Sequence, residues 1–248
     1  MKIHPTAIIH PEAQVDPEVT IGPYSVIDKN VHIHRGTQIG AHVVIEGETE
    51  IEEYCQIFHG AVIGTPPQHI KYKGEKTKVS IGARTIIREY VTIHRATAIK
   101  GITRVGKRCF FMNYSHVAHD CTIGDEVILA NCAEIGGHVE VENFAVLGGL
   151  VTIHQFVRIG ECALLGGGAI VTQDVAPYTC AVGDRARLNG LNLVGLKRRG
   201  FSTETIRALK HAYRLVFRSG ILLTDALKQI DEQIPNEPKV QHFAEFLK

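Results

Sequence analysis

The sequence predicts an all-β protein built as a parallel β-helix, with an α-helical cap at its C-terminal end. Three observations support this prediction. Apolar residues recur at every sixth position through most of the 248 residues, a period that suits neither an α-helix nor an isolated amphipathic strand. Glycine is frequent, with 24 residues, and tryptophan is absent. Beyond about residue 200 the six-residue step has ended, and apolar residues follow helical spacing instead.

The repeat begins at Ile3 and runs in steps of six to Ile63, and all of these positions hold Ile or Val. Each hexad can form one short strand and one tight turn, and three hexads can close one triangular coil. The apolar side chain then points into the prism, and successive coils stack about 4.8 Å apart. Glycine often follows the apolar residue, as in Ile21-Gly22 and Ile39-Gly40. We expect these glycines to serve turns with unusual backbone angles.

The repeat lapses at residues 65–78, a Pro- and Lys-rich segment that we interpret as an excursion loop. The step of six resumes at Ile81 and continues through Ile99 to Val171. The segment 96–104 fits the step less well, which leaves room for a second, shorter loop. The 27 hexads predict about nine coils, and so many positions at one period disfavour a β-sandwich with accidental periodicity. We therefore expect a β-helix domain at residues 1–189.

A helical domain is expected at residues 190–248, after a glycine-containing connector. Ser202 is a suitable N-cap for a helix that ends near Gly220. Thr224 can cap a second short helix, and Pro238 can open a third. This domain holds 10 Lys/Arg and 6 Asp/Glu, a balance of +4 within a chain of net charge +1. The basic excess suits an acidic partner.

Composition also narrows the function. A net charge of +1 argues against general nucleic-acid binding. No apolar run approaches the length of a membrane span, so we expect no stable membrane insertion. The six cysteines form no CxxC pair, which favours a reduced, cytoplasmic protein over a disulfide framework or a zinc ribbon.

Two histidines, His116 and His119, interrupt the small and apolar residues of the repeat. Because three hexads make one coil, His119 lies under Gly137 and Gly137 under Gln155. Asp120, by the same count, lies under His138. This arrangement offers a general base, a backbone N–H for an oxyanion and an orienting carboxylate.

Other readings of the histidines stay open. His119 can instead be an ordinary turn histidine with satisfied hydrogen bonds. His94 and His154 each follow a core position and are either site-lining or structural. We expect the five N-terminal histidines to lie on the surface: His4, His10, His32, His34 and His42. The sequence contains no GxSxG nucleophile motif and no phosphate-binding loop motif.

Seven motifs in order carry a resemblance that runs over essentially the whole chain: IHPTAIIHPEA, PPQHIKYKGEKT, IREYVTIHRAT, SHVAHDCTIG, GGLVTIHQFVRIG, DVAPY and GLKRRGFS. The chain resembles the acyl-ACP–UDP-N-acetylglucosamine O-acyltransferases of lipid A biosynthesis. The combination of AHDC, HQF and GLKRRGF is specific, whereas the hexads alone indicate only a hexapeptide transferase. The resemblance implies a left-handed β-helix.

The resemblance also implies a homotrimer with active sites between adjacent prisms. These would transfer an (R)-3-hydroxyacyl chain from acyl carrier protein to the glucosamine 3-hydroxyl of UDP-N-acetylglucosamine. His119 would be the general base, Asp120 would orient it, and the Gly137 N–H would stabilise the oxyanion. The resemblance implies no metal and no cofactor besides the phosphopantetheine of the carrier protein.

Motif matching extends to the substrate site. His116, His138, His154 and Gln155 match residues that line the sugar and acyl sites. Gln68, His69 and Lys71 belong to the matching sugar-nucleotide loop. Asn192, Arg198 and Arg199 match contacts to the nucleotide and the carrier protein. Gly167 stands where a larger side chain would shorten the acyl channel, so we predict a long acyl chain, roughly of the tetradecanoyl class.

Three residues depart from the family pattern, namely His69, Arg185 and Val194. His69 stands where an acidic residue is usual, which keeps a 3-amino sugar nucleotide open as the acceptor.

Another hexapeptide transferase that uses acetyl-CoA is a close alternative. The N-acyltransferase of the same pathway carries an additional N-terminal domain for which this chain has no room. A β-helical carbonic anhydrase with zinc on His94, His116 and His119 would show zinc-dependent activity. If the protein were a non-catalytic scaffold, replacing His119 with Ala would leave its activity unchanged.

Overall fold

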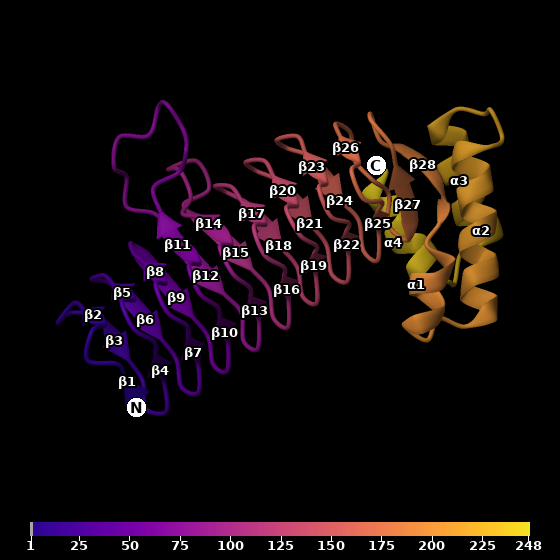
Figure 1. The fold of residues 1–248 in the computed structure, drawn as a ribbon. Helices are drawn as coiled ribbons and strands as arrows, with labels where there is room; N and C mark the ends of the chain where they lie inside the picture. The colour runs from indigo at the N-terminus through magenta and orange to yellow at the C-terminus, as the bar shows by residue number, and fades with distance from the viewer. Residues whose placement is uncertain (1) are drawn as a thin grey trace.

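The structure, a computed structural model, describes residues 2–248 as a long prism of short strands with helices at one end (Figure 1). It is a left-handed parallel β-helix in which each face of the prism is one sheet. The prediction of an all-β solenoid with a helical cap is confirmed. Strands β1–β26 correspond to about nine coils, as the hexad count predicts.

The first sheet has 11 strands in the order β1 (Lys2–Ile3), β4 (Thr20–Ile21), β7 (Gln38–Ile39), β10 (Gln56–Ile57), β13 (Ile86–Ile87), β16 (Phe110–Phe111), β19 (Ile128–Leu129), β22 (Val146–Leu147), β25 (Leu164–Leu165), β27 (Thr179–Val182) and β28 (Arg187–Leu191). The second sheet has nine strands, β2 (Ile8–Ile9), β5 (Val26–Ile27), β8 (Val44–Ile45), β11 (Val62–Thr65), β14 (Thr92–His94), β17 (His116–Val117), β20 (Glu134–Ile135), β23 (Thr152–Ile153) and β26 (Ile170–Val171). The third sheet has eight strands, β3 (Gln14–Val15), β6 (Val31–Ile33), β9 (Glu48–Ile51), β12 (Lys78–Ile81), β15 (Ile102–Val105), β18 (Thr122–Ile123), β21 (Glu140–Val141) and β24 (Arg158–Ile159).

The core of the prism consists of the hexad positions. Ile33, Ile45 and Ile63 are fully buried, and they stack on equivalent side chains of the coils above and below. Burying one such side chain contributes roughly 1.5–3 kcal/mol. Because every hexad contributes one inward side chain, the six-residue period of the sequence follows directly from the requirement to fill the prism.

Two coils are longer than the usual three hexads. Ile63 pairs with Ile93, because the chain leaves the prism between β11 and β12 as predicted. Ile81 pairs with Val105, a full hexad beyond the regular spacing, because a second loop follows β14, in the segment 96–104 where the poor fit left room for one. The assignment of Ile99 to the core was therefore wrong, and its side chain is 79% exposed in this loop. The second loop adds the length of one hexad, so the step of six stays in phase on both sides of it.

The glycines that follow the apolar residue have a different role from the one expected. Most left-handed turn positions hold other residues, such as Tyr24 (φ 58°) and Asp120 (φ 63°). A Cβ at Gly22 would lie 2.6 Å from the carbonyl carbon of Gly40 in the next coil. Close stacking of coils, and not a positive φ, therefore requires glycine here. Gly64 does have the expected left-handed backbone, with φ 84°.

Four helices follow the prism: α1 (Leu193–Arg198), α2 (Thr203–Phe217), α3 (Leu223–Gln233) and α4 (Pro238–Phe246). Ser202 caps α2 as predicted, and its hydroxyl accepts a hydrogen bond from the Thr205 N–H. The assignment of Thr224 as a cap was wrong, because α3 begins after Leu222 without a side-chain cap. Pro238 opens α4 as predicted.

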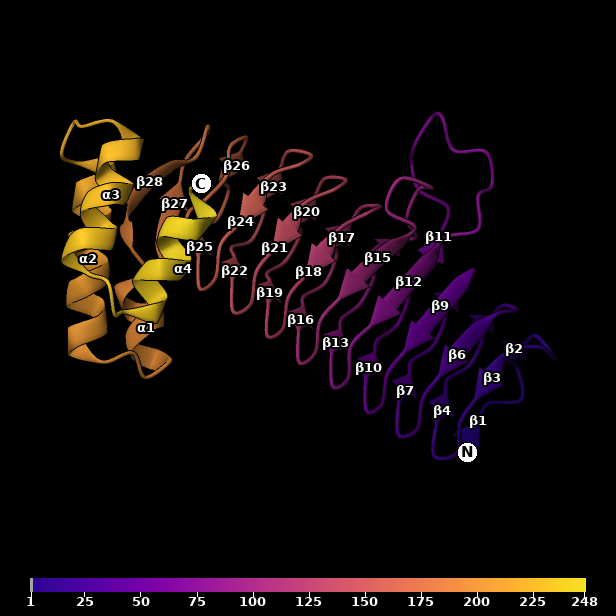
Figure 2. The same ribbon diagram turned by 180° about the vertical axis from the view of Figure 1, so that it is seen from behind.

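The connector contains an antiparallel hairpin, β27–β28, that the sequence did not predict. β27 continues the first sheet, and β28 runs across residue 189, where we place the domain boundary. That boundary stays a prediction. Figure 2 shows α2 and α3 beyond these strands at the end of the prism, whereas α4 lies against the last coils.

The helices are fixed to the last coils by an apolar cluster and by ion pairs. Tyr178, Leu209 and Phe243 are buried at its centre. The Tyr178 hydroxyl donates to Glu161 at 2.6 Å, and the Lys239 ammonium lies 2.8 Å from the same carboxylate. None of the helices within residues 2–248 combines the length and apolarity needed to cross a membrane.

Candidate active site

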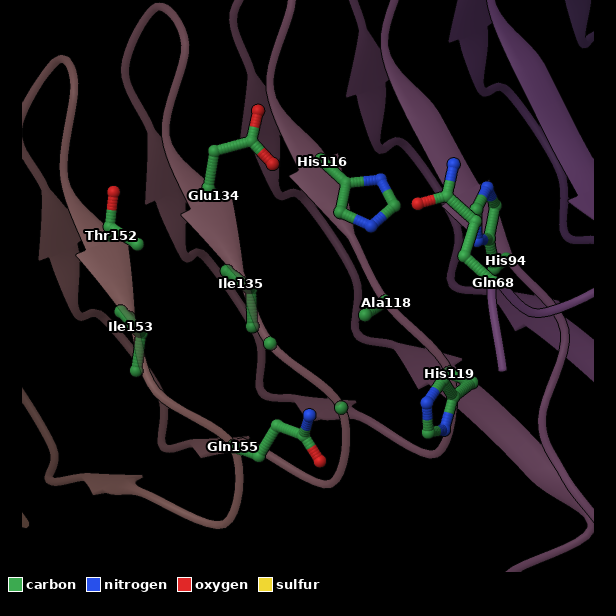
Figure 3. Close-up of a pocket in the computed structure, with 12 residues that line it drawn as sticks. Gln68, His94, His116, Ala118, His119, Glu134, Ile135, Thr152, Ile153 and Gln155 are labelled. Carbon is green, nitrogen blue, oxygen red and sulfur yellow. The ribbon is translucent and has the colours of Figure 1, made fainter. Parts of the chain in front are cut away.

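A pocket opens on the outer face of the second sheet, beside β14, β17, β20 and β23 (Figure 3). It brings together five residues that the sequence predicts as site residues, namely Gln68, His116, His119, Gly137 and Gln155. Its remaining lining consists of His94, Ala118, Glu134, Ile135, Gly136, Thr152 and Ile153. Gln68 comes from the excursion loop, so this loop forms one wall of the pocket.

His119 lies at the bottom of this pocket in a defined orientation. Its Nδ1 is 2.7 Å from Oδ2 of Asp120, and only 5% of the residue is exposed. A proton on Nδ1 is held by the carboxylate, which leaves Nε2 unprotonated and able to accept a proton. The contact with Asp120 therefore favours the tautomer of His119 that a general base requires.

Asp120 is fully buried and held as a carboxylate. Its oxygens accept hydrogen bonds from the Thr97 hydroxyl at 2.8 Å, from the Thr97 N–H and from the Lys100 N–H. Burial alone would raise the pKa of Asp120, but the hydrogen bonds from His119 and Thr97 outweigh it and lower the pKa below 3.8. The Thr97 and Lys100 donors come from the second loop, so this loop positions the acid beside the base.

Gly137 packs directly over the His119 ring. A Cβ at Gly137 would lie 2.7 Å from Cε1 and 2.9 Å from Nε2 of His119, which no side chain tolerates. The Gly137 N–H donates no hydrogen bond to any atom of residues 2–248. A backbone N–H without a protein acceptor can stabilise an oxyanion that forms beside it.

His94 and His116 form a second, uncharged wall of the pocket. Their ring centroids are 4.8 Å apart, and His116 Nδ1 lies 2.7 Å from the Thr92 hydroxyl. Burial lowers the pKa of His116 to about 4, with smaller contributions from His94 and His119. Burial also lowers the pKa of His94. Both rings are therefore neutral near pH 7 and can donate or accept hydrogen bonds to a polar ligand. His94 thus lines the site, which the sequence left open.

Sequence reasoning missed Glu134 and Thr152 as lining residues. Glu134 pairs with His116 in β17, and Thr152 pairs with Glu134 in turn. The same step of three hexads that placed Gly137 over His119 would have found them. Burial raises the pKa of Glu134.

Other predicted residues lie beside the pocket without lining it. His138 stacks on Phe156, with ring centroids 4.5 Å apart, and its Nε2 lies 3.7 Å from Asp120. His154 is exposed, with Nδ1 3.0 Å from the backbone oxygen of Gln155. His69 packs edge-on against His119, with ring centroids 5.2 Å apart. Lys71 is exposed on the excursion loop.

The predicted nucleotide and carrier contacts lie toward the helical end. The Asn192 side chain caps α1, accepts from the Gly195 N–H and donates to the Cys162 carbonyl. Arg199 pairs with Glu126 at 2.8 Å, and Arg198 is exposed. Gly167 is also exposed. The substrate contacts predicted for these residues stay predictions.

The departures Arg185 and Val194 are exposed as well. Within residues 2–248, the Arg185 guanidinium forms no salt bridge with a carboxylate within 4 Å. The effect of either residue on ligand binding stays a prediction.

Two groups of side chains within residues 2–248 have the donors and the spacing for a metal ion. One is His119, Asp120 and His138 at the pocket, and the other is Asp16, His32 and His34 near the N-terminus. The set of His94, His116 and His119 that a carbonic anhydrase would use does not form such a group in a single chain over the residues described.

Comparison with family models gives two matches. Residues 174–248 match a model described as UDP N-acetylglucosamine O-acyltransferase, domain 2. Residues 102–137 match a model described as bacterial transferase hexapeptide, six repeats. The first match covers the hairpin and helices, and the second covers the coils that hold His116 and His119.

The chain is similar to known proteins over nearly its whole length. An acyl-[acyl-carrier-protein]–UDP-N-acetylglucosamine O-acyltransferase from Thermodesulfovibrio yellowstonii is 55% identical over 247 residues, which span 99% of this chain and 96% of the relative. A protein of the same name from Syntrophobacter fumaroxidans is 47% identical over 249 residues, 100% of this chain and 96% of the relative.

Solved structures agree with this similarity. A UDP-N-acetylglucosamine O-acyltransferase from Moraxella catarrhalis superposes with a TM-score of 0.96 at 43% identity, covering 99% of this chain and 96% of that one. A structure from Acinetobacter baumannii superposes with a TM-score of 0.95 at 39% identity, covering 98% and 95% of the two chains.

Proposed function

This chain belongs to the acyl-ACP–UDP-N-acetylglucosamine O-acyltransferase family, and from that membership we propose its reaction. The enzyme transfers an (R)-3-hydroxyacyl chain from acyl carrier protein to the 3-hydroxyl of the glucosamine in UDP-N-acetylglucosamine, the first step of lipid A biosynthesis. The observation that carries the proposal is the buried His119–Asp120 pair, joined at 2.7 Å, with Gly137 of the next coil packed against the imidazole.

Each step of the transfer is assisted by one residue of the pocket or its neighbour. Nε2 of His119 takes the proton from the sugar hydroxyl, whose oxygen attacks the thioester carbonyl. The negative charge that forms on the carbonyl oxygen is stabilised by the Gly137 N–H. The tetrahedral intermediate then releases the phosphopantetheine thiolate, which recovers the proton from His119. Asp120 stabilises the imidazolium while it carries that proton.

This chemistry uses no metal ion and no cofactor besides the phosphopantetheine of the carrier protein. The acyl carbonyl is already activated as a thioester, and imidazole is a side chain that can exchange protons near neutral pH. His94 and His116, both uncharged, suit hydrogen bonds to the polar acceptor sugar, and Gln68 and Gln155 add amide donors on opposite walls of the pocket.

We also infer that the active enzyme is a homotrimer with each site between two prisms. The second sheet carries exposed apolar side chains on its outer face, with Ile8 65% and Ile170 38% exposed. The pocket lies on this same face. A neighbouring prism packed there would bury these side chains and close the open side of the pocket. Sedimentation equilibrium measures the assembly state directly, and a monomer with full activity would contradict this inference.

A 3-amino sugar nucleotide is the second candidate acceptor. The observation that favours it is His69, which stands where the family has an acidic residue and packs against the catalytic imidazole. A neutral amine at the sugar 3-position would meet an imidazole there instead of a carboxylate.

A transfer assay distinguishes these outcomes. Acyl carrier proteins loaded with 3-hydroxyacyl chains of several lengths are offered to UDP-N-acetylglucosamine and to its 3-amino analogue, and mass spectrometry identifies the product. We expect an O-acylated product from the wild type and its loss in His119→Ala. Transfer to the amine alone would favour the second acceptor, and unchanged activity in His119→Ala would refute the proposed base.

A further inference from the structure

Asp16, His32 and His34 form a compact group on the outer surface of the prism, far from the pocket in the solenoid. Asp16 follows β3 in the first coil, and the two histidines flank the last residue of β6 in the second coil. Figure 2 shows β3 and β6 side by side near the N-terminus. The sequence predicts both histidines as ordinary surface residues, but the structure holds their side chains only 33% and 28% exposed.

The distances within the group suit metal ligation. His32 Nε2 lies 3.2 Å from Asp16 Oδ1, and His34 Nδ1 lies 3.6 Å from Asp16 Oδ2. One ligand atom from each of the three residues lies within 4.8 Å of the others. Ligand bonds of about 2.0–2.2 Å place neighbouring ligands of a tetrahedral zinc ion about 3.3 Å apart. Small rotamer adjustments therefore bring all three ligand atoms onto one ion.

Glu50, from β9 in the third coil, adds an independent feature. Its Oε1 lies 3.1 Å from Nε2 of His34, the ring nitrogen that faces away from Asp16. Histidines that bind a metal through one nitrogen commonly donate the other N–H to a carboxylate, which fixes the tautomer and raises the basicity of the ligating nitrogen. His34 has this arrangement, with its Nε2 beside Glu50 and its Nδ1 on the side of Asp16, 3.6 Å from Oδ2.

We propose that Asp16, His32 and His34 bind a divalent first-row transition-metal ion, with Zn²⁺ as the best match. Two imidazoles and one carboxylate suit zinc better than Ca²⁺ or Mg²⁺, which prefer oxygen ligands. Partial exposure of the three side chains leaves the fourth ligand position to water.

The ion joins the first coil of the solenoid to the second. The first coil is the weakest part of the prism because it has a neighbour on one side only. Ile3, a hexad core position of this coil, is still 36% exposed. A metal bridge between Asp16 and the β6 histidines stabilises this end without enlarging the apolar core.

Zinc titration of the full-length, tag-free protein tests the proposal. The chelator-treated protein is titrated with Zn²⁺ by calorimetry in a non-chelating buffer, and its thermal midpoint is measured with and without Zn²⁺. We expect one ion per chain and a higher midpoint with zinc. His34→Gln should lose that ion and the zinc-dependent shift. Glu50→Gln should keep the ion with an affinity about 10–100-fold weaker. His10→Gln, another surface histidine of the first coil, is the matched control and should bind as the wild type.

Acyltransferase activity and the zinc-free thermal midpoint show whether His34→Gln, Glu50→Gln and His10→Gln are folded, since these residues take no part in the pocket, whereas His138→Gln is judged by its thermal midpoint alone. Absence of zinc binding by the wild type would overturn the proposal and leave a hydrogen-bonded surface cluster. One-to-one binding that survives His34→Gln would overturn it as well. Binding lost only in His138→Gln would place the ion at the His119, Asp120 and His138 group instead.

Discussion

Gly137 lies directly over the imidazole of His119, one coil further along the prism. A Cβ at Gly137 would approach Cε1 of His119 to 2.7 Å, closer than side chains approach one another in folded proteins. The coil spacing thus brings the Gly137 backbone against the ring of the proposed base. The proposed base and the proposed oxyanion site are held together by the stacking of two coils and not by a flexible loop.

Gly137→Ala is expected to lower kcat by about 10²-fold, because the added methyl group pushes the imidazole away from the reacting atoms. Steady-state kinetics with acyl carrier protein and UDP-N-acetylglucosamine measure the loss. Gly149→Ala is the control, since its Cβ would have only the Asn131 carbonyl oxygen near it, at 3.3 Å. Equal kinetics of the two variants would contradict the tight contact between Gly137 and His119.

Asp120→Asn is expected to lower kcat by about 10²–10⁴-fold with a smaller effect on KM. An amide at this position cannot stabilise the imidazolium, and its NH₂ favours the wrong tautomer of His119. Asp174→Asn provides the matched control, because Asp174 pairs with Arg158 on the surface at 2.8 Å. A kcat near the wild-type value in Asp120→Asn would exclude an orienting role for this carboxylate.

The half-buried His116 makes the free energy of unfolding depend on pH. Its pKa in the folded protein is about 4, against an ordinary value of 6.5, so below pH 6.5 the unfolded chain takes up a proton that the folded chain does not. Stability is therefore unaffected above pH 6.5 and falls as the pH drops toward 4. Between pH 7 and pH 5 the loss from this one group is about 2 kcal/mol.

Urea denaturation at the two pH values, at one protein concentration, checks this expectation. His116→Gln should show a pH-dependent loss smaller than that of the wild type by about 2 kcal/mol. His42→Gln, a histidine outside the pocket, should keep the full loss. An identical pH dependence in wild type and His116→Gln would show that His116 protonates freely in the folded state.

The sequence predicts most of this fold because the prism needs one inward apolar side chain in every hexad. The same rule fails at Ile99, because a loop as long as one hexad preserves the phase, although the poor fit of residues 96–104 left room for a loop there. The column over His119 follows from counting three hexads to a coil, whereas the Thr97 and Lys100 donors to Asp120 come from that loop, whose backbone path the repeat does not define. These two residues therefore could not be predicted. The β27–β28 hairpin was missed because its strands pair with each other and with the last coil, outside the six-residue repeat.

Close stacking of coils also explains the glycines of the repeat, and this can be tested by stability. A Cβ at Gly106 would lie 2.5 Å from the Gly124 carbonyl carbon in the next coil. Gly106→Ala is therefore expected to lower the free energy of unfolding by about 1–3 kcal/mol, as overpacking does elsewhere. Gly167→Ala is the control, because its nearest atom would be the Gly149 oxygen at 3.4 Å. Equal stability of the two variants would indicate that these glycines are required by turn geometry and not by close stacking of the coils.

The open space around Gly167 allows a direct test of acyl-chain selection. Only the Gly149 oxygen, at 3.4 Å, would contact a Cβ there, so Gly167→Met should fold without distortion of the backbone. If the acyl chain passes this position, the added side chain shortens the space for it. We therefore expect the ratio of kcat/KM for 3-hydroxytetradecanoyl to that for 3-hydroxydecanoyl carrier protein to fall at least tenfold, about 1.4 kcal/mol. A uniform decrease for both donors would instead indicate a general loss of activity, and Gly167 would then have no part in measuring chain length.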